Sequence, residues 1–130
     1  MKYLFDVNAL VALGFMHHEF HERTARWIKA QQFPPLASCP ITELGFVRVL
    51  SQAQPYGFTV AQARTLLQRL KRSDVVSFTF IPDGHDVSHL PVWVKSARQT
   101  TDGHLAELAK ANGAVLATLD GKIPGAYLIP

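Results

Sequence analysis

Residues 1–10 read MKYLFDVNAL, and this stretch decides the fold because an apolar run passes directly into a carboxylate. The run from Tyr3 to Phe5 predicts a short buried strand, with Asp6 at its carboxyl end. A carboxylate that is buried without a partner costs several kcal/mol. Asp6 therefore needs a surface position, a hydrogen-bonding partner or a cation.

Segments with helical and strand-like patterns alternate along the rest of the chain. We expect helices at 9–15, 17–32, 41–52, 60–72, 91–99 and 103–112, and further strands at 36–39, 75–81, 114–119 and 126–129. This order predicts an α/β fold with a mostly parallel sheet of about five strands, formed by residues 1–130 as one domain. Ligands of such sheets bind beyond the carboxyl ends of the strands, where Asp6 and Asp120 both stand.

Composition limits the classes of protein to consider. Of the 130 residues, 48% are hydrophobic and 18% charged, which is typical of a globular protein, and the net charge of +3 suits a nucleic-acid partner, an acidic protein or plain solubility. Cys39 is the only cysteine, so a disulfide framework and Cys-rich zinc modules are excluded and a reducing compartment is expected. Since no signal peptide or membrane-length apolar run is present, we expect a cytoplasmic protein without a membrane partner.

Four of the ten acidic residues are difficult to explain as solvated side chains. Asp6 and Asp120 each end an apolar strand, and Glu43 shares a helix face with three apolar residues. Asp102 opens a helix, where an ordinary N-cap is the simpler interpretation. Taken together, the four would converge at one end of the sheet.

Converging carboxylates repel one another unless a cation lies among them. All four are oxygen ligands without an accompanying Cys/His cluster, so Mg²⁺ or Mn²⁺ fits best. Such a site would orient a water, lower its pKa and neutralise charge on a phosphodiester. Asn8 and Thr118 could hold the carboxylates or waters from behind.

Three stretches carry a family resemblance: LFDVNAL (4–10), PITELGFVRVL (40–50) and TTDGHLAELAKANGAVLATLD (100–120). Together they resemble the PIN-domain family, and particularly its VapC-type toxin ribonucleases, over essentially the whole chain. The resemblance implies a three-layer α/β/α PIN-like domain with the activity of an Mg²⁺- or Mn²⁺-dependent endoribonuclease. Its acidic metal-binding and catalytic quartet would be Asp6, Glu43, Asp102 and Asp120, and its two polar positions Asn8 and Thr118.

The same resemblance implies a homodimer and a small VapB-type antitoxin, whose C-terminal segment covers the acidic groove. One departure concerns the stretch LDGKIPG (119–125), where many relatives carry a second acidic residue soon after the last Asp. A second metal ion would then be bound weakly, or only together with the substrate phosphate.

Basic residues and histidines supply candidates for substrate contacts. We expect Arg98 and His104 to contact RNA, although a histidine at the rim of the site is the simpler interpretation of His104. Phosphate contacts could also come from other cations, namely Lys71, Arg72, Lys95, Lys110 and Lys122. The cluster HHEFH (17–21) lacks an H-E-x-x-H pattern and fits the start of an amphipathic helix better than a metal site.

Two functions remain as alternatives to the endoribonuclease. A receiver-like signalling module also gathers carboxylates around Mg²⁺, but it needs a late Lys, for which only Lys122 is available. A PIN-like binding module without nuclease activity would keep the fold alone, and the four acidic positions argue against it. A phosphotransferase with a D-x-D motif fails because its second position is Asn8.

Overall fold

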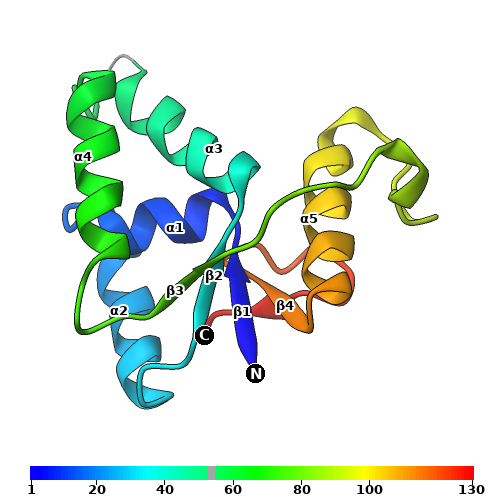
Figure 1. Cartoon of the computed structure of the whole chain (residues 1–130), viewed down its shortest axis with the longest axis horizontal. Helices are drawn as coiled ribbons and strands as arrows, with labels where there is room; N and C mark the ends of the chain where they lie inside the picture. Colours follow the sequence, from blue (N-terminus) through cyan, green and yellow to red (C-terminus); the bar gives the residue numbers. More distant parts are fainter. Residues whose placement is uncertain (53–54) are drawn as a thin grey trace.

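The computed structural model describes residues 1–52 and 55–130. Its centre is a five-stranded sheet in the order β3-β2-β1-β4-β5, and every neighbouring pair is parallel (Figure 1). The strands are β1 (Lys2–Phe5), β2 (Leu36–Ser38), β3 (Phe78–Phe80), β4 (Ala114–Thr118) and β5 (Tyr127–Leu128). The α/β prediction is confirmed, with β1 as the central strand.

Helices cover both faces of the sheet and make three layers. On one side lie α1 (Val7–Gly14), α2 (His21–Ala30), α3 (Pro40–Ser51) and α4 (Val60–Lys71), and on the other lies α5 (Thr100–Ala111) (Figure 1). Tyr3 and Phe5 pack into the core beneath α1–α4, whereas Leu4 packs with Leu105 and Leu108 of α5. A strand buried on both faces is apolar without alternation, which explains the opening run of the sequence.

Several predicted elements were wrong in extent. The helix expected at 17–32 begins only at His21, because residues before it form turns in which His18 N donates to the Phe15 carbonyl at 3.0 Å. The strand expected at 75–81 shortens to Phe78–Phe80, the three residues that pair with β2. The other boundaries agree within a few residues.

The helix expected at 91–99 was wrong. Residues 82–99, here called the 82–99 segment, leave the sheet after β3 and cross to the α5 side with only two short 3₁₀ turns, η1 (Val87–His89) and η2 (Ala97–Gln99) (Figure 1). The Gln99 side chain accepts hydrogen bonds from the backbone N of Lys95 (2.7 Å) and Ser96 (3.2 Å). These local bonds close a turn where a helix would need its own backbone ladder.

Across residues 1–52 and 55–130, no helix is long and apolar enough to cross a membrane.

The contact between α1 and α3 generates a prediction about stability. A Cβ placed on Gly45 would lie 2.4 Å and 3.0 Å from the two methyl groups of Val7, whose branched side chain has little freedom to move. Alanine is the better helix former by about 1 kcal/mol, yet overpacking costs about 1–3 kcal/mol, so Gly45→Ala should lower the free energy of unfolding. Urea denaturation measures the change.

Leu44→Ala is the matched control, since Leu44 lies next to Gly45 in α3 and is 69% exposed. It should change the free energy of unfolding by less than about 0.5 kcal/mol. A Gly45→Ala protein as stable as the parent would contradict the close packing of α1 on α3.

Candidate functional site

The topology brings the predicted acidic residues to one edge of the sheet. Asp6 directly follows β1, Asp120 lies two residues after β4, and Glu43 lies in the first turn of α3 after β2. Asp102 lies in the first turn of α5, whose N-cap is Gln99, so the interpretation of Asp102 as an ordinary N-cap is wrong. Parallel strands end at the same edge, and this edge is where α/β proteins bind ligands.

Asp6 is held in place by the start of α1. It is the N-cap of that helix, where its Oδ1 accepts a hydrogen bond of 2.8 Å from the backbone N of Ala9. Its exposed fraction is only 7%. The carboxylate therefore has a fixed position at the end of the central strand.

Three aspartates interact through their charges. Burial raises the pKa of Asp6, hydrogen bonds from Thr118 and Ala9 oppose the rise, and the charges of Asp102 and Asp120 add to it. Burial also raises the pKa of Asp102, and the charge of Asp120 adds to that rise. Asp102 and Asp120 also line one hollow, and Asp6 follows the central strand at the same edge of the sheet.

Glu43 is held by a different partner. Its Oε2 lies 2.7 Å from Nζ of Lys71 at the end of α4, and it accepts a hydrogen bond of 2.6 Å from the Ser38 hydroxyl. The same Lys71 ammonium lies 5.2 Å from the centre of the Phe80 ring. A cation from the chain itself therefore neutralises Glu43.

Thr118 and Asn8 occupy different surroundings. The Thr118 hydroxyl accepts a hydrogen bond of 2.9 Å from the backbone N of Asp120 and also hydrogen-bonds to the Asp6 side chain, so this buried residue links the Asp6 carboxylate to the backbone of Asp120. Asn8 is exposed and, together with Asp120, lines a hollow of about 310 Å³. The role expected for both residues, in support of the carboxylates, stays a prediction.

A second hollow, of about 260 Å³, lies against Asp102 and Asp120. Its walls include the cations Arg98 and Lys122 and the indole of Trp93. Arg98, which was expected to contact RNA, thus lines the same hollow as Asp102 and Asp120. An anionic ligand with an apolar part would find partners for both in this hollow.

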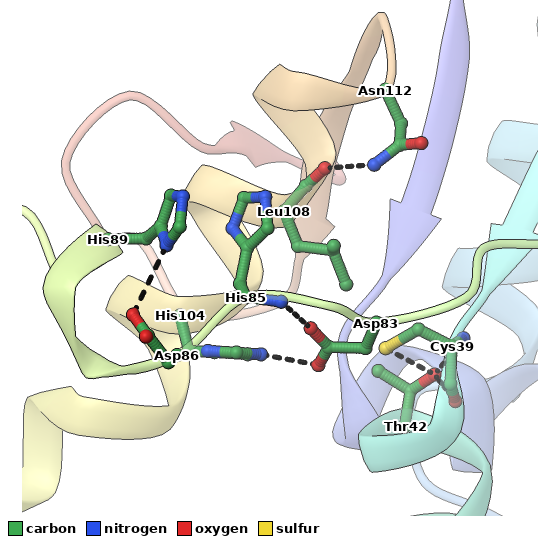
Figure 2. Close-up of polar contacts among 9 residues, drawn as sticks. All are labelled: Cys39, Thr42, Asp83, His85, Asp86, His89, His104, Leu108 and Asn112. Carbon is green, nitrogen blue, oxygen red and sulfur yellow. Dashed lines mark hydrogen bonds and ion pairs between the residues drawn. The ribbon is translucent and has the colours of Figure 1, made fainter.

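His104 is engaged within the protein. Its Nε2 lies 2.5 Å from Oδ2 of Asp83, and the two side chains are 16% and 11% exposed (Figure 2). Burial would raise the pKa of Asp83, but hydrogen bonds from His104 and from the backbone N of His85 hold it below its usual range. The pair joins α5 to the 82–99 segment, and an RNA contact by His104 stays a prediction.

The acidic residues at this edge are oxygen donors of the kind that divalent cations require. Within the described residues, no group of three or more His, Cys, Asp or Glu side chains is already arranged to hold a metal ion. The chemistry nevertheless fits, because the charges of neighbouring aspartates add to the raised pKa of both Asp6 and Asp102, and carboxylates supply the hard oxygen ligands that Mg²⁺ and Mn²⁺ prefer.

Comparison with known proteins identifies the family. A model of the PIN domain matches residues 3–127. The chain belongs to the PIN domain family. Ribonuclease VapC38 of Mycobacterium tuberculosis is 40% identical over 126 residues, which cover 92% of this chain and 86% of that protein. Ribonuclease VapC44 of the same species is 38% identical over 128 residues, covering 95% and 89%.

Two solved structures share the fold of this PIN domain. One is the crystal structure of VapBC2 from Rickettsia felis bound to a DNA fragment from their promoter, with a TM-score of 0.62 and 14% identity over 98% of this chain and 97% of that one. The other is Mycobacterium tuberculosis VapC20, described as a sarcin–ricin loop cleaving toxin, with a TM-score of 0.63 and 12% identity over 98% and 99%. The predicted PIN-like, VapC-type fold is confirmed.

Sequence reasoning missed two features of this PIN domain site. Lys71 was one of several candidates for a phosphate contact, whereas it pairs with Glu43 from 28 positions further along the chain. Trp93 was not singled out at all, because it lies in a stretch expected to be helical. Only the cluster of aromatic and basic residues in 93–98 could have drawn attention to it.

The buried charge of Asp6 predicts how stability depends on pH. In a chelator, Asp6→Asn should raise the free energy of unfolding at pH 7 by on the order of 1 kcal/mol, because Asn also caps helices but carries no charge. Since the folded pKa of Asp6 is raised, the wild type loses stability as the pH rises from the ordinary aspartate range through that pKa. The extra stability of Asp6→Asn over the wild type should therefore vanish at acidic pH. Denaturation at several pH values measures this difference.

The exposed Asp74 provides the control, since Asp74→Asn should leave the pH profile unchanged. A lower stability of Asp6→Asn at pH 7 would show that the carboxylate is stabilised by its surroundings, against the repulsion described above.

Proposed function

We propose that this PIN domain is a metal-dependent endoribonuclease of the VapC type, which hydrolyses RNA phosphodiester bonds as the toxin of a toxin–antitoxin pair. The observation that carries the proposal is the set of three mutually interacting aspartates in a chain 40% identical to Ribonuclease VapC38. The relatives are named ribonucleases, and this argues against the two alternatives, a receiver-like module and a PIN-like module without nuclease activity.

The proposed cofactor is Mg²⁺ or Mn²⁺, and Asp6, Asp102, Asp120 and Glu43 would hold it. When bound, such an ion lowers the pKa of an attacking water and neutralises charge on the phosphodiester. Glu43 would first have to part from Lys71, because an ammonium 2.7 Å away competes with any other cation. The chain thus provides a counter-charge for Glu43 before a metal ion does.

The chain's own residues would bind and orient the RNA. Arg98 and Lys122 would attract its phosphates to the hollow beside Asp102 and Asp120. Asp6 is fixed by α1 and Thr118, so its carboxylate would not need to reorganise when the substrate arrives. Water attacks phosphorus, the bond to the 3′ oxygen breaks, and the products carry 5′-phosphate and 3′-hydroxyl ends.

The proposed partners follow from the relatives. A structural neighbour is a VapBC2 complex, and we expect a VapB-type antitoxin for this chain as well. A homodimer and a cytoplasmic location complete the proposal, and the buried free thiol of Cys39 suits a reducing compartment.

Asp6→Asn should reduce RNA cleavage by more than about a hundredfold, since even the loss of residues that merely support metal ligands costs up to that factor. Sequencing RNA ends after induction of wild type and variant side by side measures the effect and shows which RNA is cut. The exposed control Asp74→Asn should cleave like the wild type. Cleavage by Asp6→Asn at the wild-type rate in Mg²⁺ would contradict the proposal.

Removal of the Lys71 ammonium should strengthen metal binding. Lys71→Met keeps the length of the side chain but frees Glu43, so the affinity for Mn²⁺ should rise about fivefold, the worth of a partly exposed ion pair. Isothermal titration calorimetry with Mn²⁺ measures the constant. Arg64→Met removes an exposed cation from the same helix and is the control for net charge. Weaker binding by Lys71→Met than by Arg64→Met would mean that Lys71 supports the site.

A further inference from the structure

We propose that the hollow beside Asp102 and Asp120 binds one unpaired nucleobase of a single-stranded RNA, with the indole of Trp93 as the stacking surface. The inference rests on the proposed function, because it assigns a place to the base of a nucleotide next to the bond that is cut. It adds a binding residue, Trp93, on a segment outside the acidic quartet.

The walls of the hollow match the parts of a nucleotide. Arg98 and Lys122 supply positive charge for phosphate, and Trp93 supplies the flat apolar surface on which bases stack. Ser96 and Gln99 add polar groups at the side. The Gln99 oxygen already accepts two backbone hydrogen bonds, which leaves its NH₂ group to donate to acceptor atoms of a base.

Trp93 packs against the core of the protein on the side of the sheet covered by α5. Its half-buried ring also lines a separate hollow with Glu107 and Lys110. One side chain that borders two hollows is a wall between them. Its packing against the core supports the side chain, and part of it borders the hollow beside Asp102 and Asp120.

The segment that carries Trp93 is held tightly to α5. A Cβ on Gly103 would lie 2.3 Å from Val94 and 3.2 Å from Pro91, so this helix position must be glycine for the segment to approach so closely. Asp83 and His104 join the beginning of the segment to the same helix (Figure 2). The binding surface is thus formed before the ligand arrives, which lowers the entropic cost of binding.

The size and charge of the hollow favour a nucleotide over a protein segment. A volume of about 260 Å³ lies below the usual range for drug-sized ligands and suits one small ring system. Arg98 and Lys122 offer partners for one phosphate, and the indole of Trp93 offers a surface for an aromatic ring. A nucleotide provides the anion and the aromatic ring in one molecule.

Tryptophan fluorescence tests the proposal directly, because the two tryptophans differ in exposure. Trp27 is 3% exposed and donates to the Tyr127 hydroxyl at 2.9 Å, so a base can stack only on Trp93. In the full-length Asp6→Asn protein, a short single-stranded RNA should quench the emission in a saturable way. A duplex of the same sequence should quench much less, because its bases are already stacked.

Kinetics on the otherwise wild-type enzyme gives the second readout. Trp93→Leu keeps an apolar side chain against the core and should raise KM for single-stranded RNA about tenfold, with kcat nearly unchanged. Trp93→Phe should recover most of the loss because it restores a stacking surface. If Trp93→Leu fails to fold, the Trp93→Phe variant and the fluorescence titration still test whether a base stacks on Trp93.

The outcomes separate this inference from the proposed function. Metal-dependent cleavage by the wild type, together with unquenched emission and an unchanged KM in Trp93→Leu, would overturn the nucleobase site and leave the nuclease intact. Saturable quenching by RNA without any cleavage would support the site and count against the nuclease. Quenching by duplex as strong as by single strand would also overturn the proposal.

Discussion

Repulsion among Asp6, Asp102 and Asp120 is the constraint around which this PIN domain is arranged. Asp6 ends the central strand and is buried, so its charge has little water to stabilise it, and two further carboxylates act on it. The backbone N of Ala9 and the Thr118 hydroxyl offset part of this cost. A cation that binds among the carboxylates would offset their repulsion.

The two sides of the candidate site are built by different means. The carboxylates stand on strand ends and helix starts of the sheet framework, whereas Trp93 and Arg98 stand on the 82–99 segment. That segment has little regular structure and depends on contacts with α5, above all the close approach at Gly103. The framework would hold the metal ligands, and the segment would add Trp93 and Arg98 beside them.

Local sequence patterns predicted the framework well because the strands obey simple rules. The run from Tyr3 to Phe5 is apolar on both faces since both faces are covered, and carboxylates at the ends of parallel strands necessarily share an edge. Contacts between distant residues left no such pattern. The Lys71–Glu43 pair and the Asp83–His104 pair depend on how α4 and α5 pack, and the 82–99 segment follows side-chain bonds of Gln99 in place of a helical period.

Carboxyl-carbon NMR titration of the metal-free protein, repeated with Mg²⁺, tests the interaction of the three aspartates most directly. The structure predicts that Asp6 and Asp102 titrate above the usual aspartate range without metal. Addition of Mg²⁺ should shift both pKa values downward, because a bound cation favours the ionised carboxylates. Ordinary pKa values for both residues in the metal-free protein, unchanged by Mg²⁺, would contradict a cation site built from mutually repelling carboxylates.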